Sequence, residues 1–419
     1  MRRGIAALGA LALVGTLAAC GGEADQSGDA ASGAGCSGRD RDRTSRLPLR
    51  VGTLTIWADD TRYGEMQEFA KDFTAETQIE LSVVQKSESD MDQEFITQVP
   101  TGKGPDLIVM AHDKLGALVT NGVVGTVDLS DVQDEFSDSA VQAVAYDGQT
   151  YGVPYAIESV ALVRNNALTT DTPTTFDDMI SSGEATGVKY PFIIQMGDEG
   201  DPYHFYPFQT SFGAPVFEQS ADGSYTTDLA LGGENGTAFA EWLKAQGDAG
   251  ILDPAITSDV AKQAFLDGKA AYTVTGPWNV TAFREAGMDV SVLPVPKAGD
   301  QDAQPFVGVQ VFFPSAKTEN QLLVNKFLEY VETAAAQQQL YEIGGRVPAM
   351  TSVAEGIDDE DIKGFATVAG AGVPMPAIPE MGSVWQFWGV TEANIVTGKE
   401  APEEGWSTMV ENIKGAIGQ

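Results

Sequence analysis

The sequence predicts an α/β protein built from two domains. Short apolar runs alternate with segments of helical spacing from residue 54 to about residue 122. This order is typical of βαβ crossovers and a mostly parallel sheet. The alternation restarts beyond Pro173. About 370 of the 419 residues follow Leu47, which is enough for two domains of ordinary size.

The first residues predict export. Residues 1–19 have the form of a signal peptide, with Met1-Arg-Arg3 before an apolar stretch from Ile5 to Leu17. Leu-Ala-Ala-Cys20 resembles a bacterial lipobox, which implies cleavage before Cys20 and a diacylglyceryl group on its sulfur; two acyl chains give stable anchoring. We therefore expect the chain at the extracellular face of the cell membrane, held by a lipid anchor alone. Plain secretion with an incidental cysteine is the alternative.

Residues 20–47 are expected to form a lipid-anchored, disordered tether. They consist mainly of Gly, Ser, Ala, Asp and Arg and contain almost nothing to bury. Cys36 lies in this stretch and has no obvious partner if Cys20 is acylated. A chain with two cysteines is not a disulfide scaffold.

Composition excludes several classes of function. The chain has 25 basic and 60 acidic residues, a net charge of −35, which disfavours nucleic acid and anionic lipid headgroups as partners. No segment after the signal peptide is apolar for long enough to span a bilayer. With His112 and His204 as the two histidines, we expect no metal site. No P-loop or dinucleotide motif is present, so no cofactor is expected.

The first part of the chain supplies a candidate ligand-binding edge. Strands are expected at 54–57, 79–84 and 106–110, and helices at 63–77, 91–99 and 113–122. His112, Asp113 and Lys114 therefore stand where a strand ends and a helix begins. In open α/β sheets ligands bind at this carboxyl-end edge. Charged residues at such a turn can also simply face solvent, and both interpretations stay open here.

Later segments continue the α/β pattern, although 122–148 gives no clear element. An extended run is expected over 151–163, interrupted by Pro154. Further elements are expected as strands at 190–195, 269–275, 290–295 and 308–313, and as helices at 176–181, 238–247, 259–266, 276–286, 320–333 and 334–343. Glu158 stands among apolar residues, and a buried acid is costly unless it is paired. It is therefore either structurally paired or facing a cleft.

Seven short segments in collinear order resemble the maltose/maltodextrin-binding lipoproteins of bacterial ABC sugar importers (extracellular solute-binding protein family 1). The resemblance runs from about residue 50 to the end of the chain. The segments are Leu-Thr-Ile-Trp57, Gly-Pro-Asp-Leu-Ile-Val-Met-Ala-His-Asp-Lys114, Val-Pro-Tyr-Ala-Ile-Glu158, Asp-Pro-Tyr203, Gly-Pro-Trp278, Pro-Phe-Val-Gly-Val309, and Met-Pro-Ala-Ile-Pro-Glu-Met381 with Trp385.

The resemblance implies a two-lobed α/β periplasmic-binding-protein (Venus-flytrap) fold, with a hinge and an interlobe cleft. The N-terminal lobe would comprise 50–157 plus 309–357, and the C-terminal lobe 158–308 plus 358–419. The implied function is that of a non-catalytic, monomeric receptor. It would bind maltose or a maltodextrin in the cleft, close by hinge bending and deliver the sugar to the permease subunits of an ABC transporter.

The resemblance also implies the sugar contacts. Aromatic rings suit the C–H faces of a sugar, and charged side chains suit its hydroxyl groups. The implied ligand-binding residues are Asp59, Asp60, Arg62, Asp113, Lys114, Glu158, Asp201, Tyr203, Trp278, Met375 and Trp385.

Several of these residues also have a purely structural interpretation. Trp385 and Trp388, three residues apart, could form an ordinary core stripe. Asp201, before Pro202, is placed as a helix N-cap. Trp57 is expected to pack in a buried strand. The two histidines are expected to be hydrogen-bonded structural residues.

The chain departs from the enteric maltose binders at four positions. Met110 stands for a Trp, Lys114 for an Arg, Gln386 for a Tyr and Gly389 for an Arg. Met stacks less definitely than Trp, and Lys gives up planar bidentate contacts. Maltose, longer maltodextrins, trehalose and other α-glucosides therefore remain alternatives.

Two further classes of function compete with the receptor. An extracellular glycoside hydrolase could use Glu158 and Asp201 as its pair of carboxyl groups, although no hydrolase signature is present. The same scaffold could carry peptides or polyamines, although a polyamine site would not need Arg62 and Lys114.

Overall fold

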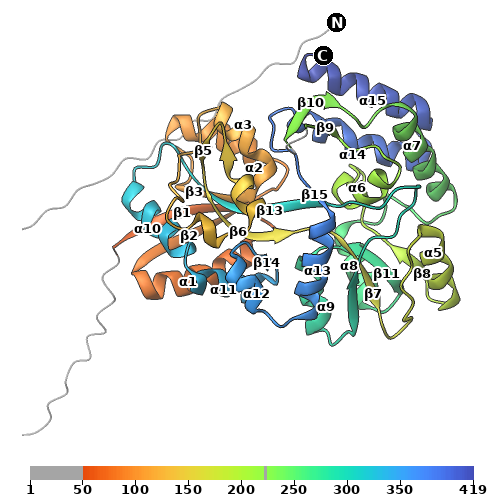
Figure 1. Cartoon of the computed structure of the whole chain (residues 1–419), viewed down its shortest axis with the longest axis horizontal. Helices are drawn as coiled ribbons and strands as arrows, with labels where there is room; N and C mark the ends of the chain where they lie inside the picture. Colours follow the sequence, from red (N-terminus) through yellow and green to blue (C-terminus); the bar gives the residue numbers. More distant parts are fainter. Residues whose placement is uncertain (1–50, 221–223) are drawn as a thin grey trace, which may run out of the picture. The chain divides into compact units, whose positions relative to one another are not determined.

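The structure is a computed structural model that describes residues 51–220 and 224–419 (Figure 1). The predicted signal peptide, the lipidation site Cys20, Cys36 and the tether lie outside the described residues. Among the helices within the described ranges, none combines the length and the apolar character that crossing a membrane requires.

Most strands fall into two separate sheets. The first sheet has the order β14-β6-β13-β3-β1-β2, with β15 added alongside β13. Its strands are β1 (Gly52–Asp59), β2 (Ile79–Lys86), β3 (Leu107–Ala111), β6 (Val153–Glu158), β13 (Phe306–Pro314), β14 (Val347–Pro348) and β15 (Val373–Pro374). The second sheet has the order β12-β7-β11-β8. Its strands are β7 (Ala161–Asn165), β8 (Tyr190–Ile193), β11 (Ala270–Thr275) and β12 (Val290–Leu293).

Two small hairpins complete the strands of the described part. They pair β4 (Ala145–Tyr146) with β5 (Gln149–Thr150), and β9 (Phe217–Gln219) with β10 (Tyr225–Leu229).

Helices flank both sheets. Those near the first sheet are α1 (Tyr63–Thr77), α2 (Met91–Gln98), α3 (Leu115–Thr120), α4 (Asp138–Ala143), α10 (Gln321–Val331), α11 (Ala334–Gly344) and α12 (Thr351–Gly356). The others are α5 (Phe176–Ala185), α6 (Pro202–Ser211), α7 (Gly233–Asp248), α8 (Ser258–Leu266), α9 (Pro277–Glu285), α13 (Glu360–Ala371), α14 (Met381–Thr397) and α15 (Pro402–Ile417). Short 3-10 turns are η1 (Val99–Thr101), η2 (His112–Lys114) and η3 (Gln133–Glu135).

The expectation of a mostly parallel sheet is wrong. β1 runs parallel to β2 and β3, and β8 runs parallel to β11. However, β13 is antiparallel to both of its long neighbours, β3 and β6, and β7 is antiparallel to β11 and β12. β13 comes late in the chain, yet it lies between β3 and β6 and runs opposite to both. Local alternation cannot reveal such an insertion.

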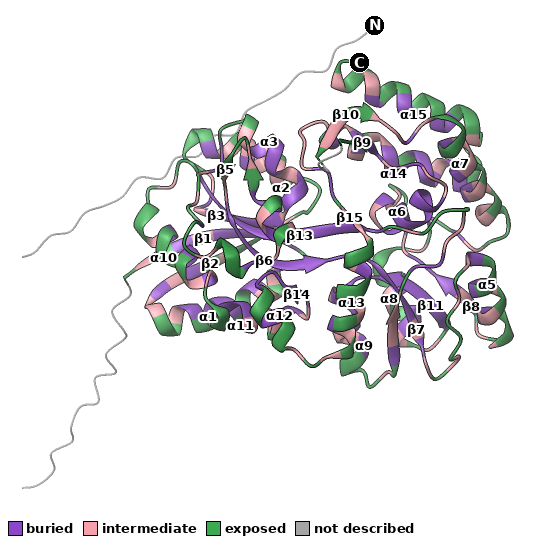
Figure 2. Ribbon diagram, viewed as in Figure 1, coloured by how far each residue is buried: buried purple, intermediate pink, exposed green. Residues whose placement is uncertain are grey.

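The extended run predicted over 151–163 divides between the two sheets. β6 belongs to the first sheet and β7 to the second, with Ser159 and Val160 between them. β13 crosses in the same region, because Gly308 pairs with Glu158. All nine residues of β13 are buried, as its purple colour in Figure 2 shows. Glu158 and Gly308 therefore lie side by side where the chain passes between the sheets.

Two hydrophobic clusters stabilise the fold. In the first, Phe73 and Phe312 pack edge-on against Phe327, with ring centroids 5.1 and 5.2 Å apart. In the second, Tyr206 stacks on Phe306 at 3.5 Å. β13 thus carries Phe306 into one cluster and Phe312 into the other, which makes it a shared element of both cores.

Candidate functional site

A buried ion pair stands at the carboxyl end of β1. The chain turns there before α1 begins at Tyr63, and Asp59 accepts hydrogen bonds from the backbone N–H groups of Thr61 and Arg62, each at 3.0 Å. It also pairs with the Arg62 guanidinium. Burial alone would raise the pKa of Asp59, but Arg62 and Thr61 outweigh it and the pKa is lowered. Asp59 is therefore an ionised acceptor.

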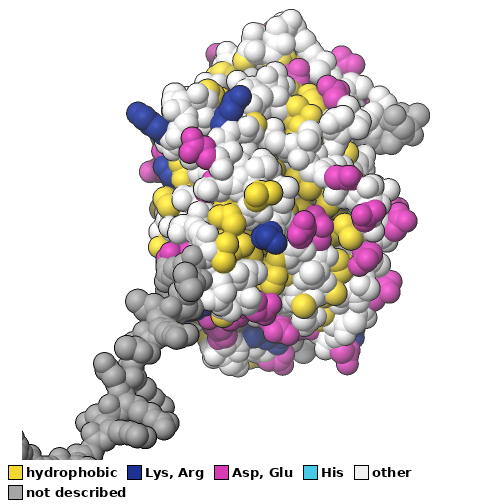
Figure 3. Space-filling model, turned by 90° about the vertical axis from the view of Figure 1, so that its left-hand side faces the viewer, with side chains coloured by type: hydrophobic (Ala, Val, Ile, Leu, Met, Phe, Trp, Pro, Cys, Tyr) yellow, Lys and Arg dark blue, Asp and Glu magenta, His cyan; other side chains and the backbone are white. Residues whose placement is uncertain are grey.

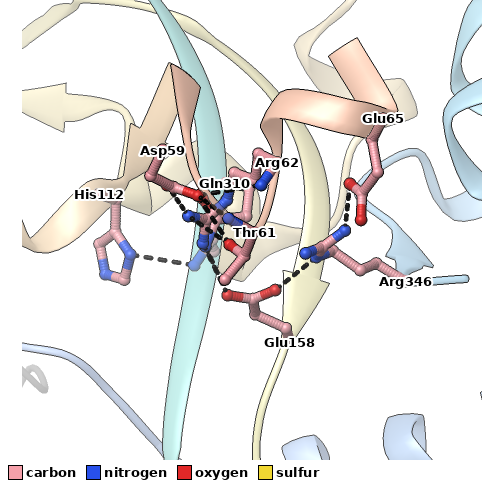
Figure 4. A network of polar contacts seen from close by, with 9 residues as sticks. Asp59, Thr61, Arg62, Glu65, His112, Glu158, Gln310 and Arg346 are labelled. Atoms are coloured by element: carbon pink, nitrogen blue, oxygen red, sulfur yellow. Dashed lines mark hydrogen bonds and ion pairs between the residues drawn. The ribbon is translucent and has the colours of Figure 1, made fainter. Parts of the chain in front are cut away.

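Glu158 is the centre of a buried polar network (Figure 4). Its Oε1 accepts from Arg62 Nη2 at 3.3 Å and from the Gln310 amide, and its Oε2 accepts from Arg346 Nε at 2.7 Å. Arg346 also pairs with Glu65 of α1. Of the two interpretations left open by the sequence, the paired one is confirmed. The network joins three carboxylates to two guanidiniums, and removing one member of a buried pair costs roughly 3–5 kcal/mol.

The turn after β3 places the three residues singled out in the sequence. His112 accepts from the backbone N–H of Val309 at 3.1 Å through Nδ1, and its Nε2 lies 3.2 Å from the Met375 carbonyl oxygen. The ring is therefore neutral with its proton on Nε2, and burial lowers its pKa. This confirms a structural role for His112. Asp113 and Lys114 form an ion pair at 3.3 Å.

Trp385 on α14 lies against this turn. Its Nε1–H donates to Asp113 Oδ2 at 3.1 Å, and Lys114 Nζ lies 5.7 Å from its ring centroid. Trp388, one turn later, is fully buried and donates to Gln209 Oε1 at 3.1 Å. The pair thus divides: Trp388 belongs to the core, while Trp385 lies at the candidate site.

Aromatic rings assemble around Phe306 at the start of β13. Tyr203 lies 6.3 Å from the Phe306 ring, Trp385 lies 6.2 Å from it, and Trp278 lies 6.4 Å from Tyr203. The Tyr203 hydroxyl is buried and has no hydrogen-bond partner within the described part. Burial raises its pKa well above the usual range, so it remains a neutral donor. This group offers flat apolar faces together with one free donor.

Gly308 connects the charged half of the site with the aromatic half. A Cβ atom built on it would lie 3.3 Å from Met375 Cε, 3.5 Å from Glu158 Cγ and 3.7 Å from the Tyr203 hydroxyl oxygen. These three predicted residues therefore converge on one point of the backbone. A residue with a larger side chain at 308 would separate them.

Two predicted residues lie apart from this point. Asp201 caps α6, accepting from the His204 N–H at 3.2 Å, and its other contacts are with the His204 ring at 2.9 Å and the Gln195 amide. The structure thus gives it the cap role and a histidine partner, and His204 is hydrogen-bonded as predicted. Asp60 is exposed, in a surface hollow that it shares with Gln85, Lys86 and Ser87.

Sequence reasoning missed four polar residues of this region: Glu65, Glu88, Gln310 and Arg346. Arg346 follows Gly344-Gly345, and two glycines predict only the end of a helix. A buried acid at 158 does, however, predict a basic partner somewhere in the chain. Glu88 follows β2 at the same sheet edge. Loss of water around this carboxyl raises its pKa, Arg62 opposes the increase, and Asp59 and Asp60 enlarge it. Ligands bind beyond the carboxyl ends of parallel strands, so a carboxylate just after β2 could have been predicted as a site residue.

Trp57 packs in its strand as expected, buried beside Phe95. Within residues 51–220 and 224–419 no three His, Cys, Asp or Glu side chains come together in a way that could hold a metal ion. What the arrangement offers is a set of fixed charged hydrogen-bonding groups opposite aromatic faces, which suits recognition of a polar ring compound.

Comparisons with known proteins bear on the family and the fold. A family model described as bacterial extracellular solute-binding protein matches residues 68–367, more than half of the chain. Two relatives come from Bacillus subtilis (strain 168). A galactooligosaccharide-binding protein is 26% identical, with 87% of this chain and 89% of the relative covered. The maltodextrin-binding protein MdxE is 27% identical, with 87% and 90% covered.

Among solved structures, the maltotriose-binding protein of Thermus thermophilus, bound to maltotriose, superposes with a TM-score of 0.80 at 28% identity. The superposition covers 87% of this chain and all of that one. The fold is thus the two-lobed fold of maltodextrin-binding proteins. The chain belongs to the bacterial extracellular solute-binding protein family.

Proposed function

We propose that this chain is the non-catalytic receptor of an ABC sugar importer and binds maltose or maltodextrin-type oligosaccharides. The supporting observation is the meeting at Gly308 of an ion-paired charged half, centred on Glu158, with an aromatic half that contains Tyr203. The lobes would be 50–157 plus 309–357 and 158–308 plus 358–419. The sugar would enter between them, and closure by hinge bending would follow.

The charged groups are suited to sugar hydroxyls. Asp113 accepts a hydrogen bond from Trp385 in this structure, and the Tyr203 hydroxyl has no partner among the described residues. A sugar could take over the first contact and satisfy the second. Hydrogen bonds to charged groups contribute roughly 1.5–3 kcal/mol each. Three or four of them with stacking on Trp278 and Trp385 would reach about −8 kcal/mol, or micromolar affinity, after the cost of association.

The proposal includes where the receptor works. Lipidation at Cys20 would hold it at the extracellular face of the cell membrane, and residues 20–47 would serve as its tether. Its partners would be the permease subunits of the importer, and we expect it to act as a monomer. Figure 3 shows one face of the molecule with scattered carboxylates and few Lys or Arg side chains, in keeping with the net charge of −35. A surface of this kind supports solubility.

Hydrolysis is the less favoured function because both candidate carboxyl groups are occupied. Glu158 is held by two guanidiniums and an amide. Asp201 is held by His204 and Gln195. A general acid or base has to reach the reacting group with a carboxyl oxygen, and the oxygens of both residues accept from protein donors instead.

The test is calorimetry and tryptophan fluorescence on the chain from Pro48, which is one compact unit. The sugars are maltose, maltotriose, maltotetraose, trehalose and a galactooligosaccharide. We expect saturable, micromolar binding of the α-glucan series with the strongest response to one chain length. No binding of any α-glucan, or a clear preference for the galactooligosaccharide, would refute the assigned cargo. Release of glucose from maltotriose that is lost in Glu158→Gln would establish a hydrolase instead.

A further inference from the structure

The segment Gly344–Arg346 links α11 to β14 and lies beside the crossing of the chain between the sheets. α11 ends at Gly344, and Gly345 has φ 66°, a left-handed conformation that favours glycine. β14 then pairs with β6, with Val347 opposite Ile157. This pairing brings Arg346 against the last residue of β6, which is Glu158.

Arg346 is almost completely buried and is held from two directions. Its Nε donates to Glu158 Oε2 at 2.7 Å, and its Nη1 pairs with Glu65 (Figure 4). Glycine at 344 leaves the room for this arrangement, because a Cβ there would lie 2.9 Å from Arg346 Nη1 and 3.0 Å from Glu65 Oε2. The absence of a side chain at 344 thus leaves space for the Arg346 guanidinium.

The same segment touches α9, the helix that carries Trp278 of the aromatic half. A Cβ on Gly345 would lie 2.4 Å from the Thr281 hydroxyl oxygen. Thr281 is in α9, about one turn after Trp278. Two consecutive residues therefore connect parts of the site: Arg346 contacts the Glu158 carboxylate, and Gly345 lies against the helix that presents Trp278.

We propose that Arg346 is a positioning residue for ligand binding, which orients the Glu158 carboxylate toward the aromatic half of the site. The inference rests on the proposed function. Without Arg346, Glu158 keeps, among the described residues, Arg62 and Gln310 as partners of Oε1, and Oε2 is unpaired in a buried place. The carboxylate would then turn toward a new partner and leave the orientation that a sugar hydroxyl needs.

The test compares Arg346→Gln with Glu342→Gln, which removes an exposed carboxylate of α11 and leaves the contacts of Arg346 and Glu158 in place. At a temperature where both variants are folded, we expect Arg346→Gln to weaken maltotriose binding at least about tenfold. Glu342→Gln should change the affinity by less than about twofold. Arg346→Lys, which keeps the charge but not the geometry, should restore part of the affinity. Equal effects of Arg346→Gln and Glu342→Gln, or none, would overturn the proposal.

A ligand-free measurement separates this proposal from the proposed function. Amide hydrogen exchange at 157–160 and 277–281 should be faster in Arg346→Gln than in the parent and unchanged in Glu342→Gln. If the parent binds none of the sugars but the exchange behaves in this way, the assigned cargo is wrong and the positioning role stands. If exchange at both segments is the same in all three proteins, the positioning role is wrong, whatever the cargo.

Discussion

Glu158→Gln is the substitution that tests the polar network most directly. The new side chain has the shape of the old one, so packing is kept and the charge is lost. Two buried guanidiniums lose a partner, Arg62 at 3.3 Å and Arg346 at 2.7 Å. The new amide also has to place an N–H group where the carboxylate accepts from donors on both oxygens.

The expected loss of stability depends on the ion pairs that the two arginines keep. Breaking a buried ion pair costs roughly 3–5 kcal/mol. Arg62 keeps Asp59, and Arg346 keeps Glu65, so the loss should fall at the lower end. We expect the free energy of unfolding to fall by about 3 kcal/mol. For a chain of this size that corresponds to a decrease in Tm of about 4 °C.

The assay is urea unfolding followed by circular dichroism, with calorimetric titration of maltotriose on the folded protein. Glu342→Gln, on the exposed side of α11, is the matched control and should stay within about 0.5 kcal/mol of the parent. Affinity should drop at least about thirtyfold in Glu158→Gln, which corresponds to the loss of one charged hydrogen bond with its orientation. A variant as stable as the control would refute the account of the network, and unchanged affinity would remove Glu158 from the site.

Three other substitutions test separate parts of the structure. Glu392 is fully buried in α14, and burial raises its pKa well above the usual range. The folded state therefore keeps a proton that the unfolded chain releases above about pH 4.3, and stability falls as the pH rises. Glu392→Gln should match the parent near pH 4 and have a higher Tm at pH 8, and an equal Tm at both would contradict this. Gly389→Ala should unfold about 2 kcal/mol more easily in urea, because a Cβ there lies 2.4 Å from the Glu199 carbonyl oxygen; an unchanged midpoint would show that the backbone yields. Trp385→Phe keeps a ring but loses the donor to Asp113, so maltotriose affinity should fall less in it than in Trp385→Ala, and equal losses would exclude a stacking role.

Much of the order of elements up to residue 343 could be read from the sequence because each signal was local, whereas the elements over 122–148 and those after residue 343 were not predicted. The spacing of Met66, Phe69, Ala70 and Phe73 fixes the buried face of α1, and the structure buries all four. The sheet assignment could not be read. The run over 151–163 has one uniform pattern, yet its halves belong to different sheets. The choice depends on β13, whose residues are distant in the chain.

The candidate site divides in the same way. The resemblance predicted Glu158, Tyr203 and Met375 as ligand-binding residues, and the structure places them together at Gly308. Whether they contact a sugar stays a prediction. Arg346 could not be predicted as a site residue, because its partner Glu158 is remote in sequence and the two residues before it are glycines. Gly389, noted as a departure, has a physical reason: the backbone at 199–200 lies too close to allow a side chain there.

The central place of β13 also bears on synthesis of the protein. β3 and β6 are made long before β13, and until residue 314 has left the ribosome their facing edges have no strand between them. A nascent or prematurely released chain therefore carries two edges with unpaired N–H and C=O groups, which are templates for aggregation. Pairing at such sequence separation is slow. Chains that stop short of β13 should therefore be recovered as insoluble material, whereas chains that stop after β13 can complete the central pairing of the first sheet.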